Sequence, residues 1–177
     1  MPDMTLADIY APIPEADQFY TWNQAKDIVL TCFNRFDEDF GRKAEAIFTE
    51  NRIHAPVLKS KRGGAFCSGA TPHKNPFVMV NYLGKSRDIS TLAHELGHAV
   101  HDMYSSKNTL TNYHPILPLA ETASVFAEMT VTDYLLTNES SKSARIALLM
   151  DKIEDLFATS HRQNMFSSFE QNIHSKI

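Results

Sequence analysis

The chain has 177 residues, of which 43% are hydrophobic and 21% charged, and its formal net charge is −4. These values are typical of a folded globular protein of about one domain and exclude disorder along the whole chain. They also argue against nucleic acid as a partner, because the chain has no basic excess with which to neutralise phosphates. No apolar stretch reaches the ~20 residues that span a bilayer, so we expect no membrane association.

The first residues and the cysteines indicate the compartment in which the protein works. The opening MPDMTLADIY has neither the basic region nor the apolar segment of a secretory signal. The two cysteines, Cys32 and Cys67, are too few for a disulfide framework and fit a reducing compartment. We therefore expect a cytoplasmic protein.

The N-terminal part of the chain predicts an arm followed by two helices. Residues 1–20 contain three prolines and no sustained period, which predicts an extended arm, with residues 21–177 forming a single domain. Thr21 and Gln24 have the T-x-x-Q spacing of a capping box, in which both side chains satisfy backbone groups at the start of a helix. Apolar residues recur at helical spacing behind them. A first helix is therefore predicted from Thr21 onward, and a second over about 37–51.

The middle of the chain predicts loops, a short strand and then more helices. Residues 56–76 hold three of the six glycines and three prolines, which predicts turns with short extended pieces. The basic run over residues 59–62 within them is predicted to be a solvated loop rather than an anion site. Residues 77–82 are apolar and closed by Gly84, which predicts a strand whose edge could pair with an extended peptide. Three helices are predicted to follow, over about 88–105, 115–137 and 140–174.

An H-E-x-x-H motif, formed by His94, Glu95 and His98, lies in the first of these three helices. Histidines at i and i+4 differ by about 40° around a helix and about 6 Å along it, so both imidazoles can reach one metal ion. A solvated polar face is the alternative, but such a face more often carries lysine, arginine and glutamate. On a helical wheel both histidines lie opposite the apolar side chains of this helix. These apolar residues are Ile89, Leu92, Ala93, Leu96, Val100 and Met103. The motif therefore predicts two metal ligands, with Glu95 beside them as a general base.

A catalytic zinc site takes three protein ligands and a water, so a third ligand is needed. His101 is excluded, because about 10 Å along the helix axis separates it from His94. His114, in the following loop, is not excluded by geometry. Glu121 is the preferred candidate, because a carboxylate on a largely apolar helix needs a partner such as a cation. Glu128 shares its face and could orient a ligand histidine, with a solvated surface position as the alternative.

Several segments together resemble the oligoendopeptidase F branch of the thimet-oligopeptidase-like zinc metallopeptidases. The matching segments are GGAFC at 63–67, PFVMVNY at 76–82, residues 87–98 with His101, and LAETASVFAE at 119–128. Weaker similarity extends over residues 22–55 and 162–174. The resemblance implies a mainly α fold, in which a helical zinc-peptidase core carries a small β element, with short strands near 64–82, beside the metal-binding helix.

The resemblance also implies an activity, namely that of a zinc-dependent metalloendopeptidase that hydrolyses oligopeptides. In such an enzyme His94, His98 and Glu121 would bind one Zn²⁺ per chain, and Glu95 would be the general base for the attacking water. Family members are several times longer and continue with tyrosine and histidine residues that hold the substrate and the oxyanion. We therefore expect either a fragment or a minimal version that completes its cleft differently.

The alternative function is a catalytically incomplete zinc-binding fragment, or a module that binds peptides without cutting them. The intact Glu95 favours an enzyme, since a purely structural metal site needs no base, whereas the absence of the downstream region favours the module. Within the chain, the candidates for stabilising an oxyanion, each with a structural or solvated role as the alternative, are Tyr104, Tyr113 and His114.

Overall fold

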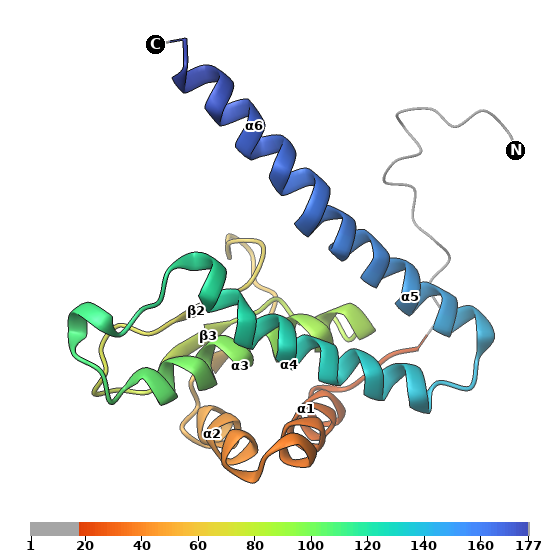
Figure 1. The fold of residues 1–177 in the computed structure, drawn as a ribbon. Coiled ribbons are helices and arrows are strands. Elements are labelled where there is room, and N and C mark those ends of the chain that lie inside the picture. The colour runs from red at the N-terminus through yellow and green to blue at the C-terminus, as the bar shows by residue number, and fades with distance from the viewer. Residues whose placement is uncertain (1–17, 177) are drawn as a thin grey trace, which may run out of the picture. The chain divides into compact units, whose positions relative to one another are not determined.

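The computed structural model describes residues 18–176, which are mainly helical (Figure 1). The helices are α1 (Trp22–Phe36), α2 (Glu38–Thr49), α3 (Ser86–Ser105), α4 (Leu117–Asn138), α5 (Lys142–Phe157) and α6 (Gln163–His174). The strands are β1 (Ile53–His54), β2 (Phe66–Ser68) and β3 (Phe77–Met79). A 3-10 turn, η2 (Leu110–Asn112), precedes α4, and a π turn, η3 (Ala158–Arg162), joins α5 to α6. The predicted mainly α fold with a small β element is confirmed.

Contacts divide the chain into two compact units, which are described separately. One unit comprises residues 18–138 and holds α1 to α4 and the three strands. Residues 139–176, with α5, η3 and α6, belong to the other. The arm predicted for residues 1–20 lies outside the described residues up to position 17, and the single domain over 21–177 stays a prediction.

The first two helices begin at the residues that cap them. Thr21 Oγ1 accepts a hydrogen bond from the Gln24 N–H at 3.3 Å, and Gln24 Oε1 accepts one from the Thr21 N–H at 2.8 Å, which is the predicted capping box. Asp37 ends α1 and caps α2 by accepting from the Phe40 N–H at 2.9 Å. The shared cap folds α2 back on α1, and from there α1 contacts α4 while α2 contacts α3.

Strand β3 lies in the middle of the sheet, whose order is β1-β3-β2. It pairs parallel with β1, where Ile53 lies opposite Val78, and antiparallel with β2, where Cys67 lies opposite Val78. The prediction that the strand at 77–82 offers an edge to a peptide is therefore wrong, because both of its edges are already paired. The free edges of this sheet belong to β1 and β2.

The loop between β1 and β2 is tied down by two side chains. Lys61 Nζ donates to three backbone carbonyls, which are those of His54 (3.1 Å), Pro56 (2.8 Å) and Val80 (2.6 Å). Asn81 Nδ2 donates to the carbonyls of Arg62 and Gly64, both at 3.0 Å. Lys61 is thus not the solvated cation that the sequence predicted, since each of the three donors of an ammonium group has a carbonyl to bind.

Helices α3 and α4 pack closely at Gly97. A Cβ atom built at Gly97 would lie 2.7 Å from both the Ala123 carbonyl oxygen and Ser124 Cα, so the two backbones approach where only glycine fits. The apolar face predicted for α3 is buried, with zero exposure at Ile89, Leu92, Ala93, Leu96 and Val100. Helices α3 and α4 therefore lie side by side (Figure 1).

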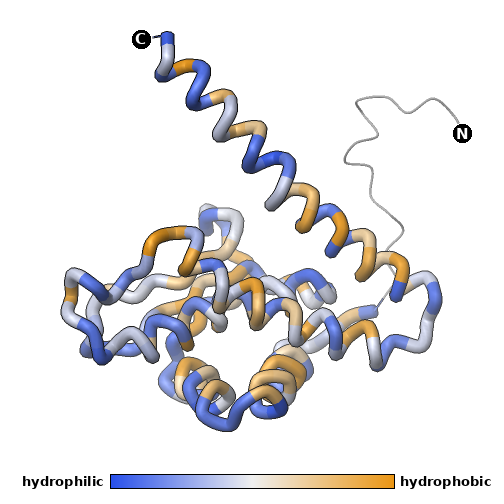
Figure 2. The backbone as a smooth tube through the Cα atoms, viewed as in Figure 1, coloured by the Kyte–Doolittle hydropathy of each residue, from blue (hydrophilic) through white to orange (hydrophobic). Residues whose placement is uncertain are grey.

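Residues 142–174 form a helical run that carries both hydrophobic and hydrophilic residues (Figure 2), and many of its large apolar side chains are exposed. Those on α5 are Ile146, Leu149, Met150, Ile153, Leu156 and Phe157, and those on α6 are Met165, Phe166, Phe169 and Ile173. Across residues 18–176 there is no helix with the length and apolar character that crossing a membrane would require.

Candidate metal centre

Three side chains from two helices converge on one point. His94 Nε2 and His98 Nε2, both on α3, lie 3.3 Å and 3.4 Å from the same atom, Glu121 Oε2 on α4. One ligand atom of each residue lies within 4.8 Å of the other two, and this is the only such group of histidine, cysteine or acidic side chains within residues 18–176. The structure thus brings together the three residues that the sequence selected as metal ligands.

The distances from Glu121 to the two imidazoles fit a tetrahedral cation. Zinc binds histidine nitrogen and carboxylate oxygen at about 2.0–2.1 Å, so two such ligands at the tetrahedral angle are roughly 3.3 Å apart. The two separations measured here, 3.3 Å and 3.4 Å, agree with that value. Two neutral imidazoles and one carboxylate are also a donor set that a catalytic zinc takes. The residues present therefore fit a divalent metal.

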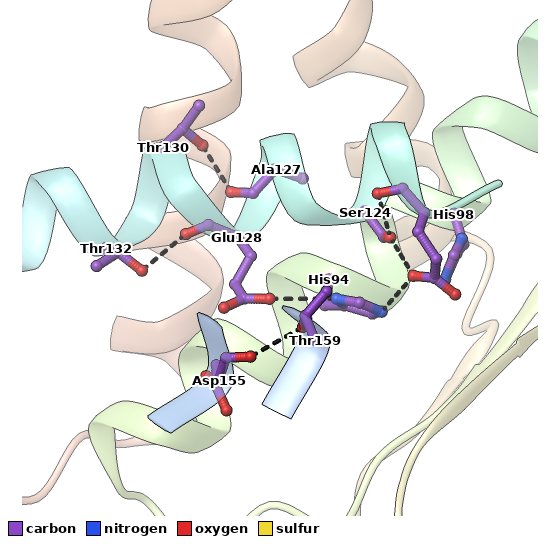
Figure 3. A network of polar contacts seen from close by, with 10 residues as sticks. His94, His98, Ser124, Ala127, Glu128, Thr130, Thr132, Asp155 and Thr159 are labelled. Atoms are coloured by element: carbon purple, nitrogen blue, oxygen red, sulfur yellow. Dashed lines mark hydrogen bonds and ion pairs between the residues drawn. The ribbon is translucent and has the colours of Figure 1, made fainter. Parts of the chain in front are cut away.

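Each of the three donors has a further contact, and Figure 3 draws that of His94 with Glu128. Glu128 Oε2 lies 3.2 Å from Nδ1 of His94, and the backbone of Ala120 lies beside the His98 ring, where it acts to raise the pKa of that ring. Ser124 Oγ donates to Glu121 Oε2 at 2.8 Å. Such partners fix which nitrogen of an imidazole faces a metal. The Glu128 contact agrees with the orienting role considered for it, whereas the contacts of Ala120 and Ser124 give no signal in the sequence.

The pKa values of the two imidazoles are shifted in opposite directions, by burial at His98 and by acidic neighbours at His94. For His98 burial is the dominant effect, and it lowers the pKa of the ring, which favours the neutral form that binds metals. Burial acts in the same direction on His94, but the hydrogen bond to Glu128 and the nearby Glu95 and Glu121 charges raise the pKa of that ring on balance. The acidic groups thus make the centre attractive to a cation.

Glu95 lies next to the donors on α3 and is 7% exposed. Burial raises the pKa of its carboxyl to about 7, against the opposing effect of His94, and the Glu121 charge raises it further. The backbone N–H of Cys67, on β2, lies beside this carboxylate and acts in the opposite direction, lowering its pKa. This proximity brings the sheet next to the centre, and it is invisible in the sequence because it involves a backbone group.

A pocket of about 360 Å³ opens beside the donors. Its walls include His98 and Glu121, together with His101, Asp102 and Cys67. His101, excluded as a third ligand from its position on the helix, lines this pocket and does not join the donor group. The centre is therefore open on one side to a molecule larger than water.

The three oxyanion candidates have different surroundings. The Tyr104 hydroxyl hydrogen-bonds to Asp39 of α2, and Tyr113 is 1% exposed, with burial and the Asp102 charge raising the pKa of its hydroxyl to about 12. Both tyrosines therefore have surroundings typical of residues that stabilise the fold, which agrees with the structural alternative for them rather than with binding of an oxyanion. His114 instead lines the pocket, with its Nδ1 3.8 Å from Asp102 Oδ1. It is not in the donor group, so the alternative third ligand is not supported.

Comparison of the sequence with known proteins shows the family to which this chain belongs. The sequence profile of Peptidase family M3 matches residues 30–177. Oligoendopeptidase F (chromosomal) of Lactococcus lactis subsp. cremoris is 32% identical over 174 residues, which are 97% of this chain and 29% of that protein. An oligoendopeptidase F homolog of Borreliella burgdorferi is 40% identical over 174 residues, 96% of this chain and 29% of that protein.

A solved structure shares nearly the whole fold. The crystal structure of a provisionally assigned peptidase from Chlamydophila abortus superimposes with a TM-score of 0.81 at 31% identity, covering 99% of this chain and 29% of that one. The chain thus spans less than a third of the length of these relatives. Because the profile covers most of the sequence, this chain belongs to peptidase family M3.

Proposed function

We propose that this chain is the zinc-binding catalytic core of a metalloendopeptidase that hydrolyses oligopeptides. The observation that carries the proposal is the convergence of His94, His98 and Glu121 on one point, with the buried Glu95 beside them. A structural metal site needs no carboxylic acid next to its ligands. The names of the relatives, oligoendopeptidases, agree with oligopeptides as the substrate class.

In this proposal His94, His98 and Glu121 hold Zn²⁺. When bound, the ion lowers the pKa of a water molecule and polarises the peptide carbonyl. Glu95 accepts the proton of the attacking water on its carboxylate and then delivers it to the nitrogen of the departing amine. The Cys67 N–H lies beside the carboxylate. Burial raises the pKa of Glu95 above its usual range, and a more basic carboxylate is a better acceptor for the proton of water.

Strand β2 is the edge to which we assign the peptide. The N–H groups of Val78 and Val80 donate to carbonyls of the β1 side, so the backbone groups of the alternate residues of β3 face β2. Cys67 lies opposite Val78, so its own N–H and carbonyl point away from β3. Both groups are directed to the outer edge of β2, on which Cys67 lines the pocket, and in this proposal the carbonyl accepts from a peptide N–H. A substrate paired there would lie next to the metal donors.

The alternative is a zinc-binding module without activity of its own. It is favoured by the surroundings of two of the oxyanion candidates, because Tyr104 contacts Asp39 and Tyr113 is buried. A cytoplasmic location also stays a prediction from the sequence.

A comparison of three proteins tests the proposal: the wild type, Glu95→Gln, and Glu45→Gln as a control at an exposed position on α2. Zinc content and cleavage of a fluorogenic oligopeptide are measured with and without chelator. We expect chelator-sensitive cleavage in the wild type and the control, and retained zinc without cleavage in Glu95→Gln. Zinc without any cleavage in the wild type would support the module instead, and full cleavage by Glu95→Gln would exclude the proposed base.

A further inference from the structure

Strand β2 packs against α3, and its Cys67 lies beside the Glu95 carboxylate and lines the same pocket as His98 and Glu121. Yet β2 has only three residues, and within the sheet it pairs with β3 alone. The loop before it contains two residues with positive φ, Ser60 at 69° and Gly64 at 82°. A short strand behind such a loop gains little stability from its own ladder, so other contacts must fix it.

Lys61 supplies the first of these contacts. Its ammonium bonds to a carbonyl of β1, one at the start of the loop and one just past the end of β3, namely His54, Pro56 and Val80. One side chain therefore clamps the ends of two adjacent strands to the loop that leads into β2. Hydrogen bonds from a charged donor are stronger than those between neutral groups, so this clamp is a strong one.

Asn81 supplies the second contact from the opposite direction. Its amide donates to Arg62 and Gly64, the residues that follow Lys61 and lead to β2. Lys61 thus reaches from the loop to the strands, while Asn81 reaches from the strand end to the loop. Between them, the two side chains fix residues 61–64 immediately before β2 begins at Phe66.

We propose that Lys61 is a positioning residue for the general base. Its three carbonyl contacts hold β2 against α3, so that Cys67 stays beside Glu95 and the outer edge of β2 lies beside the metal donors. The inference rests on the proposed peptidase function for its consequence in catalysis. Because Lys61 contacts none of the metal donors directly, zinc affinity does not depend on it.

The test compares Lys61→Met, which keeps the length of the side chain but removes the ammonium, with Lys59→Met. Lys59 is an exposed lysine of the same loop and controls for the loss of one positive charge. In Lys61→Met we expect zinc affinity within about twofold of wild type and amide exchange of residues 62–69 faster by roughly tenfold. We expect kcat to fall about tenfold to a hundredfold, because a base displaced by a fraction of an ångström loses that much. Lys59→Met should match wild type in all three.

A measurement that needs no activity separates this inference from the proposed function. The ¹³C resonance of the Glu95 carboxyl, assigned by its absence in Glu95→Gln, should shift in Lys61→Met and stay in place in Lys59→Met. That result supports the positioning role even where the wild-type chain cleaves no peptide, an outcome that would count only against the proposed function. An unmoved resonance together with unchanged exchange over 62–69 would overturn the inference. Loss of zinc binding with faster exchange along the whole chain would also overturn it, since Lys61 would then only maintain the fold.

A second variant covers the case in which Lys61→Met does not fold. Asn81→Ala removes the two bonds to Arg62 and Gly64 and leaves the ammonium in place. It should shift the same Glu95 resonance and loosen the same segment. No change in either would contradict the role of the clamp.

Discussion

Replacing Gly97 by alanine tests the packing on which the metal centre depends. The added methyl carbon would lie 2.7 Å from two backbone atoms of α4 and 2.8 Å from Ala127 Cβ. Carbon atoms in contact are normally about 3.5–4.0 Å apart, so the two helices must separate by roughly 0.8–1.3 Å. Backbone atoms cannot rotate out of the way as the end of a side chain can.

Two opposing effects set the size of the change in stability. Forcing a methyl group into a filled interface costs typically 1–3 kcal/mol. Alanine recovers about 1 kcal/mol, because glycine is a poor helix former. We therefore expect Gly97→Ala to lower the free energy of unfolding by up to about 2 kcal/mol, which corresponds to a fall in Tm of at most several degrees in a protein of this size.

The metal centre should respond more strongly than the fold. The ligands His94 and His98 lie on one helix and Glu121 on the other, so separation of the helices moves the carboxylate away from both imidazoles. Metal–ligand distances tolerate only about 0.2 Å. We expect the affinity for zinc to fall at least tenfold, as measured by competition with a chromogenic chelator.

Gly41→Ala is the matched control, because it makes the same substitution inside a helix. There the added carbon would meet only the amide end of Asn34, which can turn away. This variant should be as stable as wild type or slightly more stable, and should bind zinc equally well. If Gly97→Ala showed the same stability and zinc affinity as Gly41→Ala, close approach at Gly97 would not be what assembles the centre.

Three further predictions concern groups around the centre and in the core. Glu128→Gln should weaken zinc binding about tenfold, because it removes the charge that faces His94 Nδ1, and unchanged chelator competition would count against that role. Burial raises the pKa of both thiols, that of Cys32 to about 11 and that of Cys67 still further. Native protein should therefore react with iodoacetamide at pH 8 far more slowly than urea-unfolded protein does. Equal rates would contradict the burial of the thiols. Hydrogen bonds from Tyr104 and Lys43 lower the pKa of the Asp39 carboxyl to about 2, so its contribution to stability should be complete above about pH 4 and lost as pH falls towards 2; a difference in urea midpoint between wild type and Asp39→Asn that persisted at low pH would refute this.

The sequence predicted the helices well because their signals are local. The buried face of α3 follows from period 3.6 alone, and the start of α1 follows from the reciprocal spacing of Thr21 and Gln24. The two histidines of the motif share a helix, so their proximity needs no tertiary information. Glu121 could be selected because a carboxylate on an apolar helix needs a partner. Its proximity to the two histidines depends on how α3 and α4 pack, which periodicity alone does not specify.

What the sequence could not show depends on contacts between distant segments. The pairing of β3 on both edges involves β1, whose two residues are too few to carry any alternation. The role of Lys61 depends on three backbone carbonyls. Every residue has a backbone carbonyl, so these partners give no signal in the sequence, and the charge of Lys61 alone predicts a solvated side chain. The contact between Cys67 and Glu95 is hidden for the same reason. Backbone partners of this kind become visible only once the chain is folded.

The metal centre can also be followed by absorption spectroscopy, because its donors are two imidazoles and one carboxylate from α3 and α4. Cobalt(II) accepts the same nitrogen and oxygen donors as zinc. Its partly filled d shell absorbs visible light, whereas the filled shell of zinc does not. A cobalt-loaded chain should therefore report by its colour how many of His94, His98 and Glu121 remain bound, in the absence of any peptide.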